Sequence, residues 1–311
     1  MSIKKLCLFS FLIVFLGVGA YTIHMYVTSY RFNGMTWRTG ALIKTALTQP
    51  SSPVTVKLPS FVSTYTLYCK LMAEYVTSQD YTLRQCSYGQ LSINYFSPYD
   101  LSLLVHEVFV RNVYAFTTTN PKPVIIDCGS NIGISILFFK ALYPKAKITG
   151  FEAHPETFQV LEKNIADNKL TNITVHHAAV YDNKGTIQFM RSENAPGHPG
   201  MSIGTDQGNT IDVNTVCVSD YIDGEVDFVK IDIEGAEGAV MRDLAFSKKL
   251  GLIKQMIIEY HDNGNPNNDL TEILNHLDED NFKYMIHSEV ALPFVQGPNA
   301  GMMIYAWRNN H

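Results

Sequence analysis

The sequence predicts a domain of the doubly wound α/β class, with a mostly parallel sheet covered by helices on both faces. From residue 124 onward, short apolar runs alternate with segments of helical length. The first run, Val124 to Asp127, lies between Pro123 and Gly129 and suits a parallel strand buried on both faces. Repeated strand–helix units of this kind are typical of crossover connections in a parallel sheet.

The individual elements follow from apolar spacing and from glycine and proline positions. The predicted helices span 99–116, 134–143, 155–168, 236–244 and 269–277. The predicted strands span 124–127, 147–152, 173–180, 226–232, 255–260, 282–287 and 301–307. No helix separates the last two strands, which indicates an antiparallel edge. A turn at 183–185 and a strand at 186–190 predict a hairpin, followed by a Gly/Pro-rich loop at 192–209.

The N-terminus contains no Asp, Glu, Lys or Arg between Leu6 and Val27. As a helix, this run is about 33 Å long, enough to cross a hydrocarbon core of about 30 Å. Lys4 and Lys5 favour a cytoplasmic N-terminus. We therefore expect a cytoplasmic segment 1–5, a signal-anchor helix 6–27, a stem and lead-in region 28–97, and the α/β domain 98–311 on the lumenal side of the secretory pathway. A signal peptide cleaved near Ala20 is the alternative, and it would make the protein secreted.

Composition bears on partners and on redox chemistry. The net charge is −5, and no run of Lys and Arg is present, which argues against a nucleic-acid substrate. None of the five cysteines forms a CxxC pair or a zinc-ligand spacing. Cys69 and Cys86 flank a polar stretch, and both a disulfide and two free thiols are compatible with their positions.

Two strand ends carry the residues expected to bind a nucleoside. Asp127 ends the first strand, and Gly129, Asn131 and Gly133 follow it, where glycine permits a tight turn and close approach to a ligand. Glu152 ends the second strand, 19 residues beyond Gly133, where a carboxylate can accept the hydroxyls of a ribose. The third glycine of a dinucleotide fingerprint is missing, and no P-loop is present, so adenosine bearing an amino acid fits better than a dinucleotide.

Two further strand ends carry candidate catalytic residues. Lys230, Asp232 and Glu234 alternate along the strand that begins at residue 226, so they share one face if the strand continues. His261 follows the next strand and is a candidate general base near neutral pH. An alternative for these acids, together with Glu259, is to bind a divalent cation such as Mg²⁺.

These residues together resemble the FkbM family of class I methyltransferases. The segments that carry the resemblance are VIIDCGSNIGISILFF at 124–139, ITGFEAHPETFQVLEKNI at 148–165, VDFVKIDIEGAE at 226–237 and IIEYH at 257–261. The resemblance implies a seven-stranded Rossmann-like sheet and S-adenosylmethionine as methyl donor. It implies further that Asp127, Gly129, Asn131 and Gly133 form the cofactor loop, that Glu152 holds the ribose and that Ala178 lies near the adenine.

The resemblance also implies the reaction. It places Lys230, Asp232 and Glu234 toward the methyl group and its acceptor, which in this family is most often a hydroxyl on a sugar or natural product. We therefore expect O-methylation of a glycan or small molecule. The alternative function is a catalytically inactive, membrane-anchored domain that binds adenosine or acts as an adaptor.

Overall fold

The computed structural model describes residues 59–78, 81–190, 210–262, 265–288 and 300–308. Its centre is a seven-stranded sheet with the strand order β11-β12-β10-β9-β3-β4-β5. These strands span Val124–Cys128 (β3), Lys147–Glu152 (β4), Ile173–His177 (β5), Val226–Ile231 (β9), Ile253–Asp262 (β10), Lys283–Ser288 (β11) and Ala300–Trp307 (β12). β12 pairs antiparallel with both β10 and β11, whereas the pairs from β10 to β5 are parallel. The predicted α/β class with a mostly parallel sheet is confirmed.

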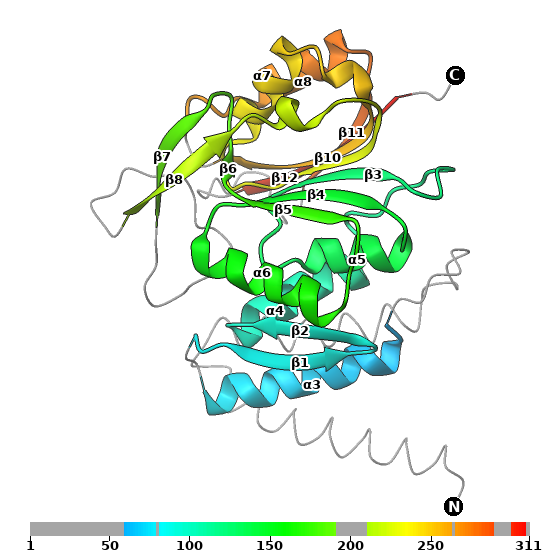
Figure 1. The fold of residues 1–311 in the computed structure, drawn as a ribbon, viewed down its shortest axis with the longest axis vertical. Helices are drawn as coiled ribbons and strands as arrows, with labels where there is room; N and C mark the ends of the chain where they lie inside the picture. The colour runs from blue at the N-terminus through cyan, green and yellow to red at the C-terminus, as the bar shows by residue number, and fades with distance from the viewer. Residues whose placement is uncertain (1–58, 79–80, 191–209, 263–264, 289–299, 309–311) are drawn as a thin grey trace, which may run out of the picture.

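Helices cover both faces of this sheet (Figure 1). On one face lie α4 (Pro98–Val105), α5 (Ile134–Leu142) and α6 (Pro155–Asp167), and on the other lie α7 (Glu237–Phe246) and α8 (Leu270–Glu279). Two apolar clusters fill the spaces between sheet and helices. Phe138 and Phe228 are buried in the first cluster, and Met241 and Ile258 in the second. β9 is buried along its whole length, as a central parallel strand must be.

The predicted helix 99–116 is shorter in the structure. α4 ends at Val105, and a π-helical turn continues from His106 to Val110. The chain then leaves the helix at Arg111 and Asn112, whose φ of 55° is left-handed. The segment beyond this bend brings Tyr114 to the sheet.

The predicted hairpin at residues 183–190 is wrong, because the strand after the turn does not pair with the strand before it. β5 stops at His177, and the chain continues as the short strand β6 (Ala179–Val180). β7 (Gly185–Met190) pairs antiparallel with β8 (Thr210–Val216), which also pairs with β6, so β8 lies between the two strands expected to be neighbours. β8 was not predicted. The loop predicted at 192–209 lies outside the described residues.

An additional layer packs against α4 and α6 on the side away from the sheet (Figure 1). It consists of α3 (Phe61–Thr77) and the hairpin β1 (Arg84–Tyr88) and β2 (Leu91–Tyr95), in a region where we predicted a stem and no element. Cys69 on α3 and Cys86 on β1 are free thiols, so the disulfide option is not realised. The predicted signal-anchor 6–27 lies outside the described residues, and none of the helices described is long and apolar enough to span a bilayer.

One asparagine joins this layer to the α/β domain. Asn164 on α6 is 1% exposed, and its Oδ1 accepts from the backbone N–H of Asn94 at 2.7 Å. Its Nδ2 donates to the carbonyl of Ile132 at 2.8 Å and to that of Asn94 at 3.1 Å. Asn168, one turn further, binds both backbone groups of Ser92 but is partly exposed.

Asn164→Ala is therefore expected to lower the free energy of unfolding by about 2–3 kcal/mol, because it leaves buried backbone groups without partners. Asn168→Ala is the matched control and is expected to cost less than about 1 kcal/mol, since water can replace its amide. Urea denaturation followed by circular dichroism measures both. Equal losses of unfolding free energy in the two variants would contradict the role of Asn164 as the buried residue that connects the layer to the α/β domain.

Candidate active site

The loop after β3 turns sharply beneath the end of β9. Gly129 and Gly133 have φ values of 83° and 90°, and Asn131 has 49°. The N–H groups of Gly129 and Ser130 both donate to the carbonyl of Phe151, at 3.0 and 2.8 Å. A Cβ at position 129 would lie 1.8 Å from the carbonyl oxygen of Asp232. Glycine is therefore required here by a backbone conformation and by a backbone contact at once.

Glu152 at the end of β4 is tied to this loop. Its Oε2 accepts from the N–H of Asn131 at 2.9 Å, and its Oε1 accepts from the N–H of His154 at 2.8 Å. The side chain is 9% exposed, and burial raises the pKa of Glu152 to about 7 although both hydrogen bonds act to lower it. The carboxylate is thus held in a fixed orientation with lone pairs left for a ligand.

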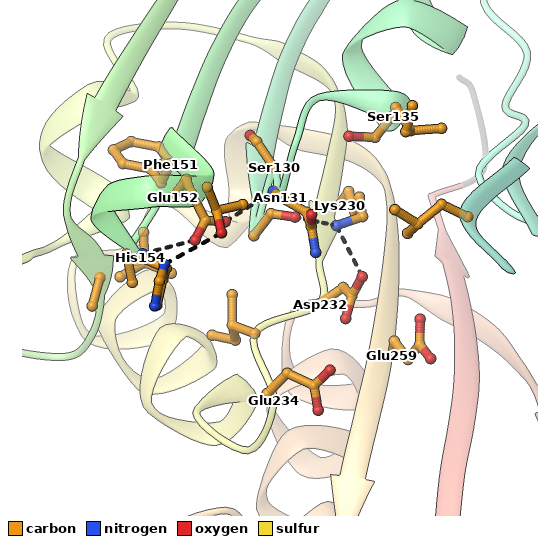
Figure 2. A pocket seen from close by; sticks show the side chains of 18 of the residues that line it. Ser130, Asn131, Ser135, Phe151, Glu152, His154, Lys230, Asp232, Glu234 and Glu259 are labelled. Carbon is orange, nitrogen blue, oxygen red and sulfur yellow. Dashed lines mark hydrogen bonds and ion pairs between the residues drawn. The ribbon is translucent and has the colours of Figure 1, made fainter. Parts of the chain in front are cut away.

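A cavity of about 220 Å³ opens over the carboxyl ends of the strands. Its wall combines the loop after β3 with the ends of β4, β9 and β10 (Figure 2). Ala178, Ala179 and Phe189 add an apolar part beside Glu152, and Leu104 and Val108 close another side. Parallel α/β sheets bind ligands at this edge, outside the carboxyl ends of their strands.

Lys230 on β9 is a buried cation at the centre of the site. It is 2% exposed, and its Nζ donates to the carbonyl of Gly129 at 2.9 Å. The same atom lies 3.1 Å from Oδ2 of Asp232 and 3.5 Å from Oδ1 of Asp127. Burial alone would lower the pKa of Lys230, but the two carboxylates outweigh it and raise the pKa. Lys230 is therefore an ammonium group, which orders the ends of β3 and β9 and cannot act as a base.

Asp232 faces the cavity just beyond the end of β9 (Figure 2). Burial would raise its pKa, but Lys230 and His261 outweigh this effect and lower it, so Asp232 is ionised. The hydroxyl of Tyr114 donates to Oδ2 of Asp232 at 2.9 Å and lies 3.3 Å from Oε2 of Glu259. Burial raises the pKa of Glu259 to about 8, and the charge of Asp232 adds to this shift.

His261 lies behind the cavity wall, in contact with acidic side chains. Its Nδ1 is 3.0 Å from Oε1 of Glu237, a side chain with 0% exposure, and its Nε2 is 3.6 Å from Oε2 of Glu234. Burial alone would lower the pKa of His261, but the hydrogen bond to Glu237 and the charges of Glu234 and Asp232 raise it to about 10. The predicted role as general base is therefore not supported, because an imidazolium near neutral pH has no lone pair to accept a proton.

The structure brings most predicted site residues to one cavity. Those that line it are Gly129, Asn131, Glu152, Ala178, Lys230, Asp232 and Glu234. Asp127, Gly133 and His261 do not. Asp127 is fully buried, where it accepts from the hydroxyl of Ser135 at 2.6 Å and faces Lys230. Gly133 caps α5. Asp127 thus supports the loop from behind instead of meeting a ligand.

Sequence reasoning missed Tyr114 and Glu237. The apolar spacing predicts Tyr114 inside a helix that runs to residue 116. The bend at Asn112 that turns Tyr114 toward Asp232 has no signal other than Asn itself, a residue that tolerates positive φ. Glu237 had a signal, because it ends the acidic segment 232–237. An acid in the first turn of a helix is expected there for the helix dipole alone, so its bond to His261 could not be foreseen.

Comparison with known proteins identifies relatives of this chain. Residues 127–284 match the family model described as the methyltransferase FkbM domain. The methyltransferase sdnD of Sordaria araneosa is 26% identical over 204 residues, which cover 55% of this chain and 78% of that protein. Methyltransferase 1 of Beauveria bassiana is 24% identical over 187 residues, which cover 52% of this chain and 74% of that protein.

Among solved structures, the FkbM methyltransferase of Methylobacillus flagellatus aligns with a TM-score of 0.44 at 14% identity, covering 89% of this chain and 62% of that one. The family match spans just over half of the chain, and it contains the loop after β3, Glu152 and the segment from Lys230 to Glu237. This chain belongs to the FkbM methyltransferase domain family.

Proposed function

We propose that this protein is an S-adenosylmethionine-dependent methyltransferase that methylates a hydroxyl group on a glycan or small molecule. The observation that carries the proposal is that one cavity has two distinct halves. One half contains Glu152 and the loop after β3, and the other contains Asp232, Glu234 and Glu259. The first half suits an adenosine, and the second suits a hydroxyl that must be aligned and deprotonated.

The residues of the first half fit the cofactor. Glu152 is a fixed carboxylate of the type that accepts ribose hydroxyls, and the small residues Ala178 and Ala179 leave space for a flat base beside Phe189. Gly129 brings backbone close to the ligand space. S-Adenosylmethionine, when bound, supplies an electrophilic methyl group on a sulfonium. The chain's contribution is to hold the acceptor oxygen in line with that group.

Asp232 is the residue best placed to receive the acceptor hydroxyl. Lys230 and Tyr114 fix its carboxylate by hydrogen bonds, while its side chain remains on the cavity wall. An alcohol oxygen becomes strongly acidic as it gains a methyl group. A carboxylate with a lowered pKa therefore suffices to take the proton, and its fixed orientation aligns the attacking lone pair.

Calorimetric titration of the purified full-length chain tests the cofactor assignment. S-Adenosylmethionine and S-adenosylhomocysteine are expected to bind, NAD⁺ is not, and Glu152→Ala is expected to abolish binding. Transfer of labelled methyl from the cofactor to glycan and small hydroxyl acceptors then tests the reaction. Binding of NAD⁺ alone would overturn the proposal. Binding of S-adenosylmethionine without turnover on any acceptor would favour the inactive adaptor function.

Cofactor affinity is expected to depend on pH through Glu152. The pKa of this group is raised to about 7, and only the ionised form accepts both ribose hydroxyls. Affinity should therefore be complete above about pH 8 and fall as the pH is lowered through 7. At pH 6 about one tenth of the groups are ionised, which corresponds to a Kd about tenfold higher. Calorimetry between pH 6 and 8 measures this, and Glu152→Gln should bind weakly with a flat profile. A flat profile in the unaltered protein would contradict it.

We propose further that residues 6–27 anchor the chain in the membrane of the secretory pathway, with the catalytic domain on the lumenal side. The uncharged run and the two preceding lysines support this. Retention of the protein in membranes after alkaline carbonate extraction is the expected result. Complete release into the supernatant would favour the cleaved signal peptide.

A further inference from the structure

A group of potential metal ligands lies at the acidic half of the cavity and in the wall directly behind it. Asp232 follows β9, Glu234 lies in the turn before α7, and His261 is on β10. One ligand atom from each of the three lies within 4.8 Å of the others. Two ligands on opposite sides of a metal with bonds of about 2.0–2.2 Å are about 4.2 Å apart, so these side chains need only small adjustments to share one ion. Figure 2 shows Asp232, Glu234 and the neighbouring Glu259 on the same side of the cavity.

His261 is held in place by a buried carboxylate on the side away from the cluster. This residue is 9% exposed, and its Nδ1 is bonded at 3.0 Å to Glu237, which has 0% exposure. Glu237 is itself fixed, because Nδ2 of Asn268 donates to its Oε2 at 2.7 Å and the N–H of Gly235 donates to its Oε1 at 3.0 Å. This support turns Nε2 toward the carboxylates, 3.6 Å from Glu234 and 3.7 Å from Glu259.

That arrangement is the one that metal-binding histidines use. A ligating imidazole commonly bonds its second nitrogen to a carboxylate, which fixes the ring and strengthens the metal-facing nitrogen as a ligand. A glutamate that only filled space in the core would not need hydrogen-bond donors from both a side-chain amide and the backbone. The carboxylates around Nε2 attract any cation, so a metal ion and a proton compete for this position.

We propose that Asp232, Glu234 and His261 bind a divalent cation, with Glu237 as the positioning residue behind His261. Two carboxylates and one imidazole suit a divalent metal ion of intermediate hardness, and we assign the site to ions of the Mn²⁺ type. Asp232 and Glu234 line the cavity, so the remaining coordination positions face it.

The consequence for the acceptor rests on the proposed function. A cation at this end of the cavity would bind oxygen atoms of the acceptor and lower the pKa of a bound hydroxyl. This favours acceptors with two adjacent oxygen atoms, such as the vicinal hydroxyls of a sugar or the hydroxyl and carboxylate of a hydroxy acid, over isolated alcohols.

Titration of the full-length chain with Mn²⁺, followed by the electron paramagnetic resonance signal of the free ion, tests the site. We expect one ion per chain in the absence of cofactor and acceptor. Glu234→Gln and His261→Gln should each weaken binding at least tenfold, and Glu237→Gln about 10–100-fold through the orientation of His261. His176→Gln is the matched control, because His176 lies on the edge strand β5, away from β9 and β10. This variant should bind Mn²⁺ as the unaltered protein does.

Competition with Mg²⁺ and Zn²⁺ reports the preference of the site, and Mg²⁺ should displace Mn²⁺ only at a large excess. A free-ion signal that the protein does not reduce, or binding that persists equally in Glu234→Gln and His261→Gln, would overturn the proposal. Glu234 is on the cavity wall and only partly buried, so its variant keeps the test decisive if His261→Gln does not fold. Calorimetry with S-adenosylmethionine reports the proposed function separately, because Glu152 is outside this cluster.

Discussion

Replacement of Asp232 by asparagine is expected to lower the turnover number about 10²–10⁴-fold, the range typical for loss of a positioned proton acceptor. The Kd for S-adenosylmethionine should stay within about threefold, since Glu152 and the loop after β3 are untouched. Asparagine keeps an oxygen that can accept from Lys230 and Tyr114, so the local structure should persist. Rapid-quench measurement of methyl transfer, combined with calorimetry, separates the two quantities.

Two further variants define what this loss means. Glu225→Gln removes an exposed carboxylate beside the opposite end of β9 and should leave turnover unchanged. Tyr114→Phe removes one hydrogen bond to Asp232 and should lower turnover about tenfold, because the carboxylate loses orientation but keeps its charge. If Asp232 acts chiefly as a metal ligand, saturating Mn²⁺ should restore part of the turnover of Asp232→Asn. Turnover at the level of the unaltered protein would remove Asp232 from the mechanism.

The central sheet could be predicted because its strands have a single physical environment. β9, for example, is buried at every position, and its residues are apolar apart from Asp227 and Lys230, each of which has a charged partner. The outer elements have weaker signals. In α3 the buried residues Leu67, Leu71 and Tyr75 recur every four positions, but the surrounding prolines and polar residues favoured a stem. β8 is a short alternating strand behind a Gly/Pro-rich stretch, and its pairing depends on contacts that no local pattern encodes.

The candidate site divides in the same way. Residues at strand ends converge by topology, so Gly129, Glu152 and Asp232 could be placed together from the sequence. The charges and orientations could not, because they depend on long-range partners. Tyr114 lies 118 positions from Asp232, and the raised pKa of His261 depends on Glu237 and Glu234 meeting it across a turn. The sequence pattern places Asp127 against the ligand, because a carboxylate beside a glycine loop can bind either a ligand or a buried lysine. In the structure it faces the buried Lys230.

Gly129→Ala is expected to lower the free energy of unfolding by about 3–5 kcal/mol and to abolish cofactor binding. The residue has a φ of 83°, which costs about 1–3 kcal/mol for a non-glycine residue. The added Cβ would in addition lie 1.8 Å from the carbonyl oxygen of Asp232. No side-chain rotation can relieve a contact with backbone, so β3 and β9 must separate at the point where the N–H of Asp232 donates to the carbonyl of Cys128. Guanidinium denaturation measures the loss.

Two other glycines show that the cause is the backbone contact and not alanine itself. Gly251→Ala adds a methyl group with no atom within 4 Å and without a left-handed φ, so its effect should be within about 0.5 kcal/mol. Gly133→Ala has a similar positive φ, but its Cβ would meet the flexible end of Leu161 at 2.7 Å, which can move. Its cost should therefore lie between the other two. If Gly129→Ala proved no worse than Gly133→Ala, the close approach of β9 to the loop could not be what requires glycine at position 129. The loop would then have to tolerate a shift that moves Asp232 relative to Glu152, and the alignment of the two halves of the cavity would be less strict than the mechanism needs.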